Sequence, residues 1–174
     1  MSNVHIEGNL QFTFPNFVDV EKFDDKQRNA YGMLSADFVA ETTDKLYLLE
    51  VKDFQNPKAP TERIAADLEM MQSACKKGES IFCLKMGQKV KDSLLRKYAQ
   101  GDVFSKSVHY LLFVNFDLFG SDERTLLKTK ISGFVPTGLN DNRFPAFTNI
   151  SFDLVNVEQL KNYGIICEER NGEA

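Results

Sequence analysis

Two carboxylates and a lysine lie close together within residues 34–54 (LSADFVAETTDKLYLLEVKDF), a stretch that predicts two strands joined by a tight turn. Side chains alternate between the two faces of a strand, so Glu50 and Lys52 project from the same face of the second strand, over residues 46–54. That strand begins with apolar residues on both faces, which is typical of a central strand. Charged groups there are costly unless they are paired, hydrated or bound to a metal ion. Glu50 and Lys52 are therefore the first candidates for chemistry in this chain.

The turn between the two strands determines which residue faces Glu50. Residues 42–45 (TTDK) form a turn-like tetrapeptide between two apolar runs. Whether the loop comprises these four residues or only 43–44, Asp37 lies directly opposite Glu50, with the Cβ atoms about 5 Å apart. A loop of three or five residues would break this pairing. Opposed carboxylates repel each other, but they supply the converging oxygen ligands that a divalent cation needs, so the pairing predicts a metal site.

The spacing of these residues resembles a motif of the PD-(D/E)XK nuclease superfamily, which has the restriction-endonuclease-like fold. Asp37 is followed by twelve residues and then by Glu50, Val51 and Lys52 at the end of an apolar strand. The resemblance implies that Asp37 and Glu50 bind Mg²⁺ or Mn²⁺, and that Lys52 activates or orients the water that attacks a phosphodiester bond in DNA. The backbone carbonyl of Val51 is a further candidate ligand, because carbonyl oxygens suit such ions.

Other parts of the family pattern are altered in this sequence. Ala36 stands where many members have a proline before the Asp. Many members also carry an upstream acidic residue, for which Glu21 is the candidate here and Glu7 the weaker one. Many nucleases of this kind pair in order to cut both strands, so the resemblance also implies a homodimer.

Other interpretations of the motif remain open. Glu50 and Lys52 could form an ordinary ion pair on a sheet face, worth only about 0–1 kcal/mol, but that leaves Asp37 opposite Glu50 unexplained. The protein could have the nuclease fold without catalysis, as a nucleic-acid-binding or accessory subunit of a restriction, repair or mobile-element system. A third alternative is an unrelated α+β interaction domain.

A basic segment between residues 76 and 106 is the candidate surface for the phosphates of DNA. Lys85, Lys89 and Arg96 are the phosphate contacts that we predict within it. A solvated helix face is the simpler explanation of the same charges. The net charge of the whole chain is −4, which argues against a protein that coats nucleic acid by bulk charge.

The remaining sequence predicts a single domain over residues 1–174 with a mixed α/β fold, in which a central mixed sheet is flanked by helices. Residues 79–99 could contain a short strand at 81–84, but a second helix, with a candidate break at Gly87, is preferred. Other strands are predicted at 10–14, 17–23, 108–116 and 147–155, and helices at 62–78, 121–131 and 158–163.

Composition narrows the class of protein. The chain has 174 residues, of which 43% are hydrophobic and 26% charged, which is typical of a globular domain. It contains no apolar run long enough to span a membrane, and residues 1–12 lack the basic and apolar regions typical of a signal peptide. Its three cysteines favour neither a disulfide framework nor a zinc site. Its two histidines are too few and too scattered for a histidine-based site. We therefore expect a cytoplasmic location.

Overall fold

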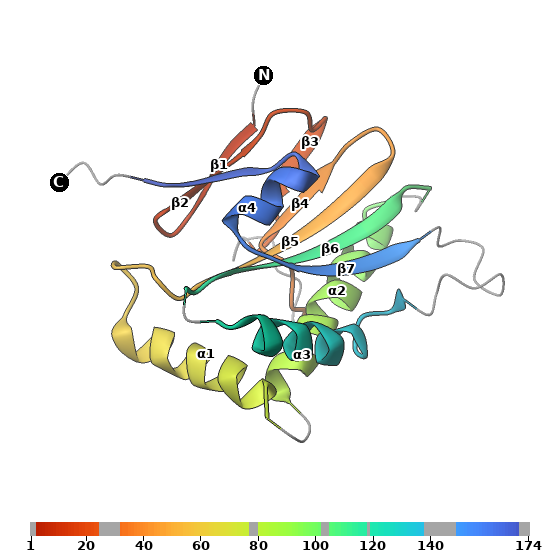
Figure 1. The fold of residues 1–174 in the computed structure, drawn as a ribbon. Coiled ribbons are helices and arrows are strands. Elements are labelled where there is room, and N and C mark those ends of the chain that lie inside the picture. Colours follow the sequence, from red (N-terminus) through yellow and green to blue (C-terminus); the bar gives the residue numbers. More distant parts are fainter. Residues whose placement is uncertain are drawn as a thin grey trace.

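Two β-sheets pack face to face, and helices cover the outer face of the larger sheet in the computed structural model (Figure 1). The structure describes residues 3–24, 32–76, 80–101, 105–117, 119–137 and 149–170. The prediction of a mixed α/β fold with a mixed sheet covered by helices is confirmed. Among the described residues, no helix has the length and apolar character that crossing a membrane requires.

The larger sheet has five strands in the order β3-β4-β5-β6-β7. The pairs β3–β4 and β4–β5 are antiparallel, whereas β5–β6 and β6–β7 are parallel. A second, antiparallel sheet has the order β1-β2-β8. In chain order, the strands are β1 (Asn3–Glu7), β2 (Leu10–Phe14), β3 (Asp19–Lys22), β4 (Phe38–Glu41), β5 (Lys45–Asp53), β6 (Ser107–Asn115), β7 (Ile150–Val155) and β8 (Ile166–Glu169).

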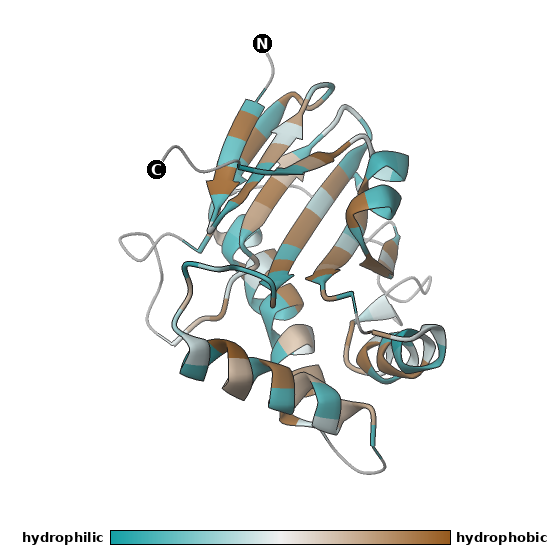
Figure 2. Ribbon diagram, turned by 60° about the vertical axis from the view of Figure 1, so that its left-hand side comes forward, coloured by the Kyte–Doolittle hydropathy of each residue, from teal (hydrophilic) through white to brown (hydrophobic). Residues whose placement is uncertain are grey.

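Three long helices lie on one face of the five-stranded sheet, and a short helix lies with the smaller sheet on the other face (Figure 1). The helices are α1 (Thr61–Ala74), α2 (Ile81–Ala99), α3 (Ser121–Ser132) and α4 (Val157–Leu160), the last continued by a 3₁₀ turn, η2 (Lys161–Tyr163). In Figure 2 the strands of the large sheet are mainly brown, whereas α1 is banded teal and brown, as expected of an amphipathic helix at the edge of a core.

The alternation of side chains along β5 divides the molecule into two hydrophobic cores. Leu46 and Leu48 face the helices and join the core formed with α1, α2 and α3. Tyr47, Leu49 and Val51 face the smaller sheet and pack with its phenylalanines. Glu50 is the next residue of β5 on the face of the sheet that the helices cover, so its carboxylate is buried between the sheet and the helices.

Helix α2 is continuous through Gly87, so the predicted break there is wrong. Ser80 caps the helix by accepting a hydrogen bond from the Cys83 N–H at 3.3 Å. A Cβ atom at Gly87 would lie 2.5 Å from the Cβ of Phe134. Glycine is therefore needed for close packing against the segment that follows α3, and not for a bend in the helix.

The N-terminal region differs most from the prediction. Residues 10–14 form a strand as expected, but they belong to a separate sheet with β1 and β8 rather than to the central one. The predicted strand at 17–23 is the shorter β3. Residues 77–79 cover the predicted end of one helix and the start of the next, and residues 147–148 the predicted start of the strand at 147–155. Both segments lie outside the described residues.

Candidate functional site

Asp37 and Glu50 meet because a two-residue loop fixes the pairing of β4 with β5. Phe38 pairs with Leu49, and the Thr42 N–H donates to the Lys45 carbonyl at 2.9 Å across the turn. This is the predicted register, and its continuation places Asp37 opposite Glu50. The Val51 N–H donates to Asp37 Oδ2 at 2.6 Å, which holds the Asp37 carboxylate against β5.

Glu50 is fully buried, and two lysines neutralise it. The Lys52 Nζ lies 2.9 Å from Glu50 Oε1. The Lys89 Nζ, which comes from α2, lies 2.8 and 2.7 Å from the two carboxylate oxygens of Glu50 and 3.8 Å from Asp37 Oδ1. An ammonium group thus lies between the two carboxylates, where a cation is favoured electrostatically.

In this cluster, burial and the repulsion between Asp37 and Glu50 oppose the attraction of the two lysines, and the pKa values shift accordingly. Burial, followed by the negative charge of Glu50, raises the pKa of Asp37 to about 8, despite the opposing effect of Lys89 and Lys52. Burial alone would lower the pKa of Lys52, but Glu50 and Asp37 outweigh burial and raise it. Lys52 therefore stays protonated at neutral pH, and Asp37 is a carboxyl whose charge is suppressed until a further cation favours it.

The predicted phosphate contacts take three different positions. Lys89 is part of the carboxylate cluster rather than of an outer surface. Arg96 is buried, donates to the Phe23 carbonyl at 2.6 Å and stacks on the Phe23 ring, 3.7 Å from its centroid. Lys85 is exposed on α2. Of these three residues, only Lys89 lies at the site, whereas Arg96 is a buried residue that contacts Phe23.

Asp24, upstream of the hairpin, is an acid whose pKa is influenced by Lys89 and Glu50 of the cluster, and the sequence analysis missed it. Burial, then the charge of Glu7, raises the pKa of Asp24, and Glu50 contributes to the same shift. Glu21, the predicted upstream acid, lies on β3 with its Oε1 3.7 Å from Arg96. Asp24 lies two residues after the end of β3. The Phe23 N–H donates to the Asp37 carbonyl at 2.8 Å, so the chain just before Asp24 is held next to Asp37.

The acidic residues offer a metal ion only part of a coordination shell. Within the described residues, no group of three or more His, Cys, Asp or Glu side chains is arranged to hold a metal ion. Asp37, Glu50 and the carbonyl of Val51 would supply three ligand groups. That set fits Mg²⁺, which usually keeps several waters and binds through one or two carboxylates together with substrate phosphates. The Lys89 ammonium would have to leave Glu50 for such an ion to bind.

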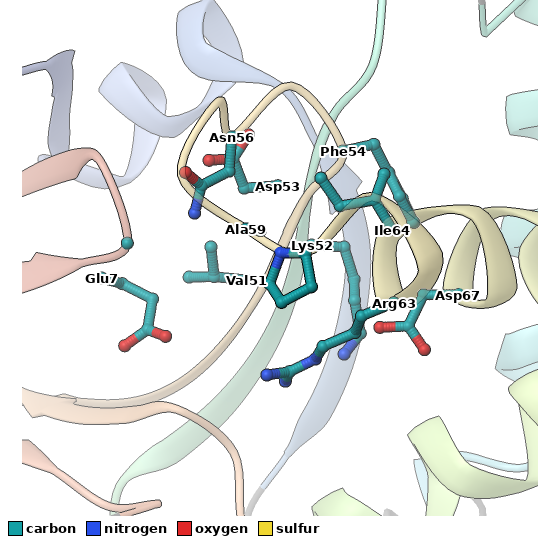
Figure 3. Close-up of a pocket in the computed structure, with 12 residues that line it drawn as sticks. Glu7, Val51, Lys52, Asp53, Phe54, Asn56, Ala59, Arg63, Ile64 and Asp67 are labelled. Atoms are coloured by element: carbon teal, nitrogen blue, oxygen red, sulfur yellow. The ribbon is translucent and has the colours of Figure 1, made fainter.

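A pocket of about 300 Å³ opens beside the cluster, where β5 ends (Figure 3). Its walls come from the β1–β2 turn, the end of β5, the following loop and the first turns of α1; they include Glu7, Val51, Lys52, Phe54, Arg63 and Ile64. Figure 3 shows the side chains of Lys52 and Arg63 extending in the same direction at this pocket. Its lining has two cations, Lys52 and Arg63, and three acidic residues, Glu7, Asp53 and Asp67, so it is a mixed-charge pocket. Asp37 and Glu50 are not among the lining residues, and Lys52 is the charged residue that the pocket shares with the cluster.

Histidine and cysteine do not add a second centre. His109 Nδ1 lies 2.9 Å from the Ser151 hydroxyl, and its ring stacks on Tyr47, as expected of a satisfied histidine within a sheet. Cys75, Cys83 and Cys167 are free thiols.

Comparisons of the chain with protein-family models, with curated proteins and with solved structures found no match.

Proposed function

We propose that this protein is a divalent-metal-dependent nuclease that hydrolyses phosphodiester bonds in DNA. The observation that carries the proposal is the buried, opposed pair Asp37 and Glu50, with Lys52 on the same face and a pocket beside it. Burying two facing carboxylates is unfavourable for a purely structural hairpin, and strongly shifted pKa values beside a pocket favour a functional site. The five-stranded mixed sheet supports the restriction-endonuclease-like interpretation of the motif.

Each residue has a role that its environment allows. Asp37, Glu50 and the Val51 carbonyl would hold Mg²⁺ or Mn²⁺, and the bound ion would supply polarisation of the scissile phosphate and a more acidic water. Lys52 is kept protonated by the adjacent carboxylates, so it stabilises developing negative charge and orients the water rather than removing a proton from it.

Arg63 positions the substrate strand in this proposal. Its guanidinium forms no hydrogen bond or ion pair with any described side chain, although it lines the pocket beside Lys52. A guanidinium can bind a phosphate through two parallel hydrogen bonds. Arg63 therefore binds a phosphate next to the one that is cleaved, and Arg63→Ala should weaken binding of DNA more than it slows the chemical step.

The direct test is cleavage of DNA in the presence of Mg²⁺ or Mn²⁺. We expect Glu50→Gln and Lys52→Ala to lower the rate by about 100-fold or more, as loss of a group that stabilises the transition state does. Glu41→Gln and Lys106→Ala are matched controls, because they remove a Glu–Lys contact at the other end of the same hairpin. Full activity in both Glu50→Gln and Lys52→Ala would refute the mechanism.

A second candidate function is a non-catalytic nucleic-acid-binding or accessory subunit with the same fold. The position of Lys89 favours it, because this ammonium already neutralises Glu50 without a metal ion. Calorimetry with Mn²⁺ separates the two functions. Binding to the wild type supports the nuclease, whereas binding only to Lys89→Met would indicate that the lysine has replaced the metal.

A further inference from the structure

The face of α2 that points away from the sheet carries a stripe of exposed apolar side chains. Ile81, Leu84, Leu95 and Tyr98 are 67%, 53%, 58% and 68% exposed, respectively, on a helix whose opposite side is buried. Most large apolar side chains of the described chain are buried, so four exposed ones on a single helix form an unusual surface.

The spacing of this stripe is that of a coiled-coil seam. Counting from Ile81, its members and the two exposed polar residues between them, Gln88 and Lys91, follow one another at alternating steps of three and four. These are the a and d positions of a heptad repeat, which face a partner helix. The helix has 19 residues, so the seam runs through its whole length.

The stripe is also complementary to itself when the second helix runs in the opposite direction. Ile81 and Tyr98 are equidistant from the midpoint of the stripe, which lies between residues 89 and 90 of α2, and so are Leu84 and Leu95. We propose that α2 is the interface of an antiparallel homodimer, in which Leu84 packs on the partner's Leu95 and Ile81 on the partner's Tyr98. Such a two-fold interface uses the same surface of both copies, as most closed dimers do.

Charge favours this direction over the parallel one. Beside the seam, the exposed Lys85 would approach the partner's half-buried Asp92, and symmetry forms the same opposite-charge contact twice. Asp92 Oδ2 accepts from the Leu34 N–H at 2.8 Å within its own chain, which fixes the position of this carboxylate beside the seam. In the central layer, Gln88 would meet the partner's Lys91. A parallel pairing would instead place Lys91 against the partner's Lys91, and like charges at facing positions are destabilising.

The proposed interface is separate from the candidate active site. The described residues that line the pocket come from other elements than α2. Lys89, although it belongs to α2, is directed to Glu50 and is not part of the seam. The dimer would leave both pockets open, and the inference does not depend on nuclease activity.

Sedimentation velocity over a wide range of concentration tests the interface. We expect the wild type to dimerise, and Leu84→Glu and Leu95→Glu to be monomeric at every concentration with unchanged circular dichroism, since both side chains are exposed. Leu126→Glu on α3, where the leucine is 41% exposed outside the seam, is the matched control and should still dimerise. A wild type that stays monomeric, or glutamate variants that still dimerise, would overturn the proposal.

Cysteine cross-linking tests the direction independently. Leu84→Cys and Leu95→Cys proteins are mixed and treated with a mild oxidant, which accepts the two electrons released when two thiols form a disulfide. The antiparallel register predicts a disulfide between the two variants and little in either variant alone, because each position faces the other across the seam. Efficient cross-linking of Leu84→Cys to itself would contradict the antiparallel arrangement.

Discussion

Each end of the β4–β5 hairpin holds a glutamate between two lysines, and α2 supplies one lysine to each end. At the turn, Glu41 lies 3.0 Å from the Nζ of Lys97 and 2.8 Å from that of Lys106. The lysines outweigh the effect of burial and lower the pKa of Glu41. The two lysines thus stabilise the charged form of the Glu41 carboxylate, as in an ordinary structural ion-pair network.

The other end of the hairpin adds a second carboxylate to the same arrangement. Glu50 also has two lysines, Lys52 and Lys89, but Asp37 faces it, and both carboxylates are buried. The pKa of Asp37 rises to about 8, whereas that of Glu41 falls. The comparison teaches that the lysines are common to both ends and that the second buried carboxylate is what distinguishes the candidate site. Local conflict of this kind is expected at functional sites.

The largest expected difference between the two ends is in stability after one lysine is removed. Lys89→Met leaves two buried carboxylates with one cation, so it should lower the free energy of unfolding by about 3–5 kcal/mol. Lys106→Met leaves Glu41 half-buried with Lys97, and should cost about 1 kcal/mol or less. Urea denaturation of both variants measures this difference. Equal losses would show that the Asp37 end is an ordinary ion-pair network.

The two ends should also respond to pH in opposite directions. The pKa of Asp37 is about 8 in the folded protein and 3.8 ordinarily, so the folded state binds more protons between these values. Its contribution to stability therefore falls as pH rises from about 4 to about 8. Glu41, whose pKa is lowered from 4.5, contributes stability above that pH and loses it as pH falls.

Thermal unfolding across this pH range tests the opposite slopes. Asp37→Asn should remove the loss of stability on the alkaline side, and Glu41→Gln should remove the loss on the acidic side. An Asp37→Asn protein whose stability keeps the wild-type dependence between pH 4 and pH 8 would show that Asp37 ionises normally in the folded state.

A smaller effect is expected from moving α2, which delivers a lysine to each end. In Gly87→Ala the new Cβ would meet the Cβ of Phe134 at 2.5 Å, so overpacking should cost about 1–3 kcal/mol. Gly87 lies two residues from Lys89 and ten from Lys97, so the Glu50 end should change more. Nuclear magnetic resonance of the lysine ammonium groups would measure the change at Lys89 and at Lys97. Equal changes at the two lysines would contradict the expected larger effect at the Glu50 end.

The smallest expected effect comes from the turn itself. The Thr42 hydroxyl accepts a hydrogen bond from the Lys45 N–H at 3.1 Å and lies 3.0 Å from Asp44 Oδ1. Thr42→Val should therefore cost about 0.5–1.5 kcal/mol. Because the strand register persists, the variant should keep the pKa of Asp37 and any metal binding unchanged. Altered titration of Asp37 in Thr42→Val would show that the two ends are coupled.

Local sequence rules were sufficient for the hairpin and insufficient for its surroundings. Turn chemistry and strand alternation predicted the register, and with it the facing of Asp37 and Glu50, because both depend on neighbouring residues. Lys89 was assigned to an outer basic surface, since helical periodicity does not reveal which strand end lies beneath a given turn. Contacts such as Lys89 with Glu50 arise from tertiary packing between segments 39 residues apart.

The N-terminal sheet escaped prediction for a related reason. β1 is short and half-exposed, so its apolar pattern is weak. β2 pairs with β8, which lies near the other end of the chain, and a local sequence pattern does not predict such a pairing. Asp24 was overlooked because its relation to Glu50 depends on how β3 pairs with β4. Residue type and spacing thus predict the candidate site residues within one hairpin. The residues that reach the site from other elements, such as Lys89, can be identified only from the three-dimensional structure.

The two-residue loop at Thr43 and Asp44 has a consequence for how this gene can vary. Side chains alternate with a period of two, so an inserted residue that shifted β4 by one position would turn Asp37 to the opposite face of the sheet. A substitution at the hairpin tip is tolerable, whereas one added or deleted codon there would dismantle the Asp37–Glu50 pair without altering either residue.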